Sequence, residues 1–114
     1  MEDGMKCLVV IDPQNDFCPG GALAVEDGDT IMSSINDMMS VHDLVVLTQD
    51  WHPTGHSSFA SSHPGKTPLE MVDMPYGPQV LWPDHCIQGS EGAAFHADLD
   101  ISLASAIIRK GMNP

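Results

Sequence analysis

The chain has 114 residues, which is enough for one domain of ordinary size. Hydrophobic residues make up 42% of it and charged residues 18%, a globular composition that excludes an intrinsically disordered chain. Sixteen acidic residues against four basic ones give a formal net charge of −12. This charge repels phosphate backbones and anionic membrane surfaces, so it argues against nucleic-acid or membrane binding.

The start of the chain and its cysteines bear on the cellular compartment. The first residues, MEDGMKCLVVID, lack the basic start and long apolar core of a signal peptide, and no apolar run reaches the roughly 20 residues of a membrane span. Cys7, Cys18 and Cys86 are widely spaced and form no CxxC pair, which argues against a disulfide framework. We therefore expect a cytoplasmic protein with reduced thiols.

The first apolar run, Met5 to Ile11 (MKCLVVI), predicts a strand buried on both faces, with Asp12 at its carboxyl end. After a glycine-containing turn, apolar residues recur at helical spacing and predict a helix that ends near Met39 and packs on a sheet. Asp27 and Asp29 are expected to cap the N-terminus of this helix. The apolar stripe consists of Ile31, Met32, Ile35, Met38 and Met39.

Leu44 to Thr48 predicts a second apolar strand, so that strand, helix and strand form a right-handed βαβ unit with parallel strands. Ser57 to Gln79 shows no sustained periodicity and predicts a long ordered loop or lid. Ser90 to His96 favours a short helical turn, and Ser102 to Lys110 (SLASAIIRK) ends in a third strand.

One helix is too few for the predicted sheet. Strands that are apolar on both faces need helices on both faces, and only one convincing helix is present. We therefore expect residues 1–114 to be the N-terminal part of a single three-layer α/β domain, interrupted just after its third strand.

Polar residues lie at the carboxyl ends of all three predicted strands: Asp12, the loop around Asp50, and Lys110. In open parallel sheets, functional groups gather at this edge. A loop-capping role for Asp12, or a solvated strand-end charge at Lys110, would explain either residue alone. The agreement of three positions instead predicts a shared crevice.

The segment TQDWHPTGH, Thr48 to His56, contains a proline and a glycine that break helical periodicity, so it should be a loop. Asp50 and His52 are two residues apart and share one side of an extended segment; a carboxylate with an imidazole suits Zn²⁺, Mn²⁺ or Fe²⁺. His85, in the tight turn WPDHC, is the best candidate for a third ligand. A DxH pair alone is more commonly a surface carboxylate–histidine pair, but the flanking strand and the second histidine turn favour a metal site.

Four segments, in order over almost the whole chain, carry a resemblance to one family: VVIDPQNDFCPGGALAV, LTQDWHP with HSSFAS, WPDHCIQGSEGA with FH, and RKGMNP. They closely resemble the N-terminal half of nicotinamidases, members of the isochorismatase-like hydrolase family. The resemblance implies a six-stranded, Rossmann-like parallel sheet flanked by helices. It also implies hydrolysis of nicotinamide to nicotinate and ammonia, a reaction of NAD salvage.

The resemblance assigns roles to the residues at the strand ends. Asp12 matches the family's catalytic aspartate and Lys110 its lysine; a carboxylate can take the proton of a nucleophilic thiol, and a nearby ammonium favours the thiolate. The family's metal ligands match Asp50, His52 and His85, with His56 as a possible further ligand. The divalent ion, with zinc expected and manganese or iron as alternatives, would hold water and the pyridine nitrogen of the substrate.

Two aromatic residues, Phe17 and Trp82, match family positions that flank the pyridine ring, where stacking and desolvation favour a flat ligand. Both can equally be core residues, although Trp82 adjoins His85 and so favours the site. The expected partner is therefore a small molecule, nicotinamide or an analogue. A homo-oligomer or a complementing C-terminal chain is a further possible partner.

The family's nucleophilic cysteine lies downstream of the lysine, in a segment such as ATD.CV that this sequence does not contain. None of the three cysteines matches it, so we expect the chain alone to lack turnover. Two alternatives stay open: a catalytically inactive metal-binding fragment that needs a complementing chain, and an isochorismatase-like hydrolase acting on another amide or a vinyl ether. The three-ligand metal set argues against the second, because in this family it goes with nicotinamidases.

Overall fold

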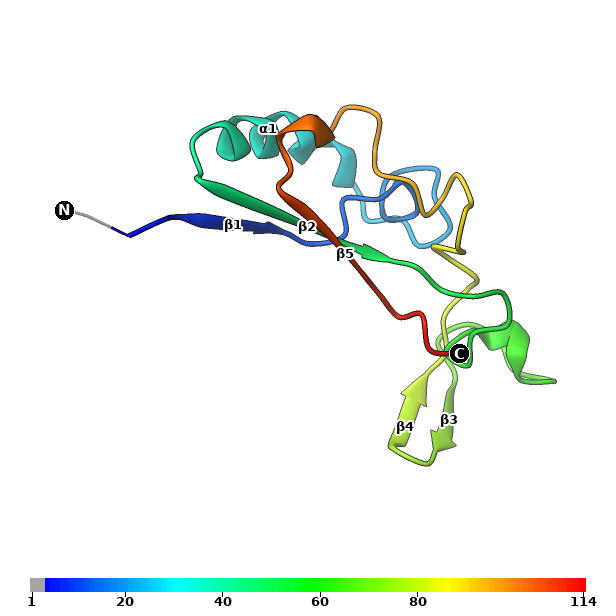
Figure 1. Ribbon diagram of the computed structural model, residues 1–114. Coiled ribbons are helices and arrows are strands. Elements are labelled where there is room, and N and C mark those ends of the chain that lie inside the picture. The colour runs from blue at the N-terminus through cyan, green and yellow to red at the C-terminus, as the bar shows by residue number, and fades with distance from the viewer. Residues whose placement is uncertain (1–3) are drawn as a thin grey trace.

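The computed structural model describes residues 4–114, and three parallel strands form its main sheet (Figure 1). Strand β1 is Cys7–Val10, β2 is Leu44–Asp50 and β5 is Ala106–Lys110, in the order β1-β2-β5. Val9 pairs with Val46, and Asp50 pairs with Lys110. The predicted α/β class and the parallel sheet are confirmed.

The connection from β1 to β2 contains a 3₁₀ turn, Gly28–Ile31, followed by helix α1, Met32–Ser40. Met32 and Met39 are buried and join the core cluster with strand residues. The outer members of the predicted stripe, Ile31 and Met38, are 53% and 47% exposed, because they lie beside β1 rather than over the sheet. The predicted side-chain cap by Asp27 was wrong, since this residue has a left-handed backbone and its side chain makes no capping bond.

Only one face of the sheet is covered within residues 4–114. Helix α1 lies over this face (Figure 1), and the strand residues Val10, Val45 and Leu47 are buried in the same core cluster as Met32 and Met39 of the helix. On the opposite face Val9 and Ile108 are 54% and 55% exposed. The prediction that the strands are buried on both faces is therefore wrong for the described residues, because burial needs a second layer, and the three-layer arrangement stays a prediction.

The segment predicted as a loop or lid contains regular structure. A 3₁₀ turn, Ala60–Ser62, precedes an antiparallel hairpin of β3, Met71–Met74, and β4, Gly77–Val80, which projects from the rest of the molecule (Figure 1). At its base the backbone of Trp82 bonds to that of Ala60 and Ser58, so the ends of the segment are fixed to each other.

The region after the hairpin is a chain of turns. Residues 90–96 contain turns and no helix, so the predicted helical turn was wrong. A 3₁₀ turn, Ile101–Leu103, leads into β5, so the prediction that the segment from Ser102 to Lys110 ends in a strand is confirmed. No helix within residues 4–114 has both the length and the apolar character needed to cross a membrane.

Candidate active site and metal centre

Three charged side chains meet at the carboxyl edge of the sheet. Asp12 follows β1, Asp50 ends β2, and Lys110 ends β5. The Lys110 Nζ donates hydrogen bonds to Asp12 Oδ2 at 2.8 Å and to Asp50 Oδ1 at 2.5 Å. The structure therefore brings together the three strand-end residues that the sequence singled out.

Asp12 is held on both carboxylate oxygens. Its backbone has a φ of 52°, a left-handed conformation that is costly for a residue with a side chain. The backbone amide of Asp12 donates to Thr48 Oγ1 at 3.0 Å, and the Thr48 hydroxyl donates back to Asp12 Oδ1 at 2.7 Å. Because Lys110 occupies Oδ2, the carboxylate has one fixed orientation.

Asp50, His52 and His85 form a three-residue group that can hold a metal ion. One donor atom from each lies within 4.8 Å of the other two, and His52 Nε2 lies 3.7 Å from Asp50 Oδ2. Tetrahedral zinc with bonds near 2.1 Å places its donors roughly 3.4 Å apart, so closing the group needs only small side-chain movements. Both histidines are buried, which fits ligands better than a solvated surface pair.

The proton on each imidazole is placed by a backbone carbonyl. His52 Nδ1 bonds to the Gly111 carbonyl at 2.8 Å, and His85 Nδ1 bonds to the Pro83 carbonyl at 2.8 Å. A carbonyl only accepts, so Nδ1 carries the hydrogen and the Nε2 lone pair is available. One carboxylate and two such imidazoles fit Zn²⁺, Mn²⁺ or Fe²⁺ and leave coordination positions for water or a ligand.

His56 lies next to this group but is held differently. Its ring centroid is 4.3 Å from that of His52. The Nδ1 atom of His56 accepts from the Ser58 backbone N–H at 3.1 Å, and burial followed by the charge of His52 lowers its pKa. His56 is not one of the three converging residues, and its role as a further ligand stays a prediction.

The charges of the site shift the pKa values of its members. Burial alone would raise the pKa of Asp50, but the neighbouring His52 imidazole and the Lys110 ammonium outweigh it and lower the value to about 2. The neighbouring Asp50 carboxylate raises the pKa of His52 against the opposing effect of burial. Burial likewise opposes, but does not outweigh, the hydrogen bonds to Asp12 and Asp50 that raise the pKa of Lys110. At neutral pH, Asp50 is therefore a carboxylate and Lys110 an ammonium.

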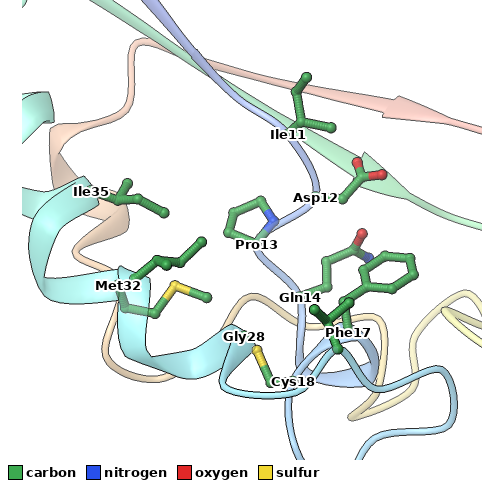
Figure 2. A pocket seen from close by; sticks show the side chains of 11 residues that line it. Ile11, Asp12, Pro13, Gln14, Phe17, Cys18, Gly28, Met32 and Ile35 are labelled. Carbon is green, nitrogen blue, oxygen red and sulfur yellow. The ribbon is translucent and has the colours of Figure 1, made fainter.

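A cavity of about 300 Å³ opens beside Asp12 between the end of β1 and helix α1 (Figure 2). Phe17 lines it, and the Phe17 ring centroid lies 5.8 Å from that of His85. Trp82 is not among the lining residues of this cavity. The substrate-stacking roles of Phe17 and Trp82 stay predictions, with Phe17 the better placed.

None of the three cysteines has the properties of a nucleophile at this site. Cys7 is exposed at the start of β1, the end of the strand remote from Asp12. Burial, then the charge of Asp16, raises the pKa of Cys86 to about 12, and burial with the charge of Asp29 raises that of Cys18. Both buried thiols stay protonated at neutral pH, when the thiolate is the reactive form.

Two side chains that the sequence reading missed support the site. Gln14 is fully buried; its amide donates to the Asp50 carbonyl and accepts from the Asp50 N–H, at 2.8 and 2.9 Å. Asp16 accepts from the backbone N–H of Cys86 at 2.7 Å and so fixes the turn that carries His85. The motif DPQND contains both residues, but nothing in their spacing indicates these remote backbone partners.

The parallel sheet and the strand-end site define an α/β protein whose candidate site lies at the carboxyl edge of the sheet, and comparison with known proteins gives the family. The isochorismatase domain family matches residues 6–113, so the chain belongs to this family. The chain is 51% identical over 114 residues to a nicotinamidase of Acinetobacter baylyi, covering 99% of this chain and 53% of that protein. The resemblance to nicotinamidases predicted from the motifs is confirmed.

Solved structures agree with the sequence relatives. A nicotinamidase pyrazinamidase of Acinetobacter baumanii superposes with a TM-score of 0.94 at 55% identity, covering 99% of this chain and 55% of that one. A pyrazinamidase of Pyrococcus horikoshii in complex with zinc gives a TM-score of 0.72 at 37% identity, covering 97% and 54%. The chain spans about half the length of the curated relatives it matches.

Proposed function

We propose that this chain contributes the metal site and the aspartate–lysine pair of an amidohydrolase that converts nicotinamide and water to nicotinate and ammonia. The observation that carries the proposal is the meeting of Asp12, Lys110 and the Asp50–His52–His85 group at one edge of the sheet. Identity of 51% to a nicotinamidase supports nicotinamide as the substrate.

Asp12 would act as the general base. Its Oδ1 and Oδ2 are held by Thr48 and Lys110, so a thiol proton can be accepted at a fixed position. The Lys110 ammonium favours the thiolate and the negative charge that develops on the amide oxygen when the sulfur attacks the amide carbon. The proton passes through Asp12 to the departing ammonia, and water then hydrolyses the thioester.

Asp50, His52 and His85 would hold the divalent ion through one oxygen and two Nε2 atoms, with His56 close enough to join after a side-chain movement. Zinc is the expected ion, since the Pyrococcus horikoshii relative was solved in complex with zinc, and manganese or iron are the alternatives. When bound, such an ion supplies positive charge that attracts a pyridine nitrogen and polarises water. Phe17, beside His85, would stack on the ring, and Trp82 is the second candidate for that role.

The nucleophile would come from residues outside these 114. This part of the proposal rests on the protonated state of Cys18 and Cys86 and on the position of Cys7. The cysteine would lie either on the same polypeptide or on a complementing chain. We place the reaction in the cytoplasm as a step of NAD salvage, consistent with three unpaired cysteines.

Ammonia release from nicotinamide tests the proposal. The 114-residue chain is assayed alone and with a polypeptide carrying the remaining half of the Acinetobacter baylyi nicotinamidase, and each assay is repeated with Asp12→Asn. We expect no turnover by the chain alone, turnover by the mixture, and loss of at least 100-fold with Asp12→Asn. Metal binding without turnover in the mixture would favour a noncatalytic metal-binding fragment, and turnover of a vinyl ether instead would favour a different hydrolase of the family.

A further inference from the structure

The two imidazoles of the proposed metal site differ in what orients them. His85 Nδ1 donates to Pro83, two residues earlier in the same turn, so this ring is held locally. His52 Nδ1 donates to the carbonyl of Gly111, which follows β5 and is remote in sequence. The orientation of His52 therefore depends on the segment that follows β5, and not on its own loop alone.

Gly111 also meets the His52 ring sterically. A Cβ atom added at Gly111 would lie 2.5 Å from His52 Cε1 and 2.8 Å from His52 Nδ1, closer than such atoms approach in folded proteins. The φ angle of Gly111 is +70°, a conformation that side-chain-bearing residues adopt at a cost. Both the conformation and the contact favour glycine at this position, and the contact is with the ring itself.

The same turn belongs to the lysine that pairs with the carboxylates. Gly111 directly follows Lys110, and the Lys110 carbonyl accepts from the Trp51 backbone N–H at 2.9 Å. The end of β5 is thus bonded to the residue just before His52. This bond brings the Gly111 carbonyl to the imidazole at a fixed distance.

We propose that Gly111 is a positioning residue for the metal ligand His52. Its carbonyl keeps the hydrogen on Nδ1, which leaves the Nε2 lone pair for the ion, and its lack of a side chain leaves room for the ring. The inference rests on the metal site of the proposed function and extends it to a residue that touches neither ion nor substrate.

Zinc affinity of the purified protein, measured by competition with a chromogenic chelator, tests the inference. Gly111→Ala should weaken zinc binding about 10- to 100-fold, the usual range when a partner of a ligand is disturbed. The matched control is Gly65→Ala, because Gly65 has a φ of +80° and no atom within 4 Å of an added Cβ. This control carries the backbone strain without the contact and should bind zinc as the unmodified protein does.

Cobalt substitution adds a readout that a general loss of stability does not move. The visible absorption bands of bound Co²⁺ report ligand geometry, and Gly111→Ala should shift or weaken them while Gly65→Ala leaves them unchanged. Unchanged affinity and spectrum in Gly111→Ala, or equal losses in the two variants, would overturn the inference. If the unmodified protein binds no zinc, the proposed metal site itself fails, which is a separate result.

The double variant His52→Ala/Gly111→Ala decides whether the glycine acts through the ring. Alanine at position 52 removes the atoms that the new Cβ would meet, so Gly111→Ala should lower zinc affinity no further in that background. Any loss of folding stability caused by Gly111→Ala should also be recovered there. A further tenfold loss of zinc affinity when Gly111→Ala is added to His52→Ala would show that Gly111 acts elsewhere. If Gly111→Ala alone unfolds the protein, a double variant that stays unfolded would show the same.

Discussion

Lys110→Met removes the ammonium that lies between two carboxylates at the edge of the sheet. Lys110 Nζ is 2.8 Å from Asp12 and 2.5 Å from Asp50, whose side chains are only 14% and 15% exposed. A pair of unit charges at 2.8 Å is worth roughly 1.5 kcal/mol in water and roughly 6 kcal/mol at an effective dielectric constant of 20. The lysine side chain is 45% exposed, so solvent screening and desolvation offset most of this attraction. We expect the free energy of unfolding at pH 7 to fall by about 2 kcal/mol.

Urea unfolding of the metal-free protein measures this loss. The variants are Lys110→Met, Asp12→Asn and the double variant, with Lys66→Met as a control because Lys66 pairs with Glu70 at 3.8 Å on the surface and should show no measurable change. Without the lysine, Asp12 and Asp50 repel each other, so Asp12→Asn should recover about 1 kcal/mol of what Lys110→Met loses. Equal urea midpoints for Lys110→Met and the unmodified protein, or strictly additive single variants, would refute the treatment of the three charges as one coupled group.

Three further outcomes are expected. The pKa of Asp50 is lowered to about 2, so the stabilising effect of its carboxylate is present above the ordinary carboxyl pKa and is lost as pH falls through about 2. In the metal-free protein, Asp50→Asn should therefore flatten the fall in the free energy of unfolding below about pH 4. A variant whose urea midpoints follow the same pH profile as the unmodified protein would contradict this. Iodoacetamide at pH 8 should alkylate the exposed Cys7 and leave the buried Cys18 and Cys86 unmodified until the protein unfolds. Mass spectrometry measures the labelling of each cysteine, and rapid labelling of Cys86 in the folded protein would show that its thiol is not held protonated. Asp16→Asn should lower the free energy of unfolding by about 1–2 kcal/mol and weaken zinc binding, because a neutral amide holds the backbone N–H of Cys86 less strongly than a carboxylate does. Urea and zinc titrations identical to those of the unmodified protein would exclude Asp16 as support for the turn that carries His85.

The strands were predictable because continuous apolar runs are a strong local signal. The run from Met5 to Ile11 contains β1 and the run from Leu44 to Thr48 contains most of β2. What the runs do not specify is which atoms cover them, and Val9 is exposed because no described residue packs on its face. The hairpin was missed because each strand has four residues, with Pro78 inside the second, so neither shows an alternating pattern.

The candidate site was also predictable only in part. Asp12 and Lys110 were predictable from topology, since parallel strands present their carboxyl ends at one edge. The approach of His85 to His52 depends on a parallel bridge between His52 and Ile87 and on a hydrogen bond from the His52 backbone N–H to the Cys86 carbonyl. These contacts join residues remote in sequence, and no spacing pattern predicts them. The turn WPDHC indicated His85 as a candidate ligand, but only the fold shows that His85 lies close to Asp50 and His52.

The pairing of β5 with β2 connects the two halves of the site. Asp50 lies opposite Lys110 in the ladder, so the lysine reaches both carboxylates while the next residue, Gly111, reaches His52. A slip of one residue would place Arg109 opposite Asp50. In the observed register the guanidinium of Arg109 instead lies 3.7 Å over the Trp51 ring, on the other face of the sheet. Such a slip would withdraw the ammonium from the carboxylates and the carbonyl from the imidazole together. The contacts of Lys110 with both carboxylates and the orientation of the proposed metal ligand His52 therefore depend on one strand register.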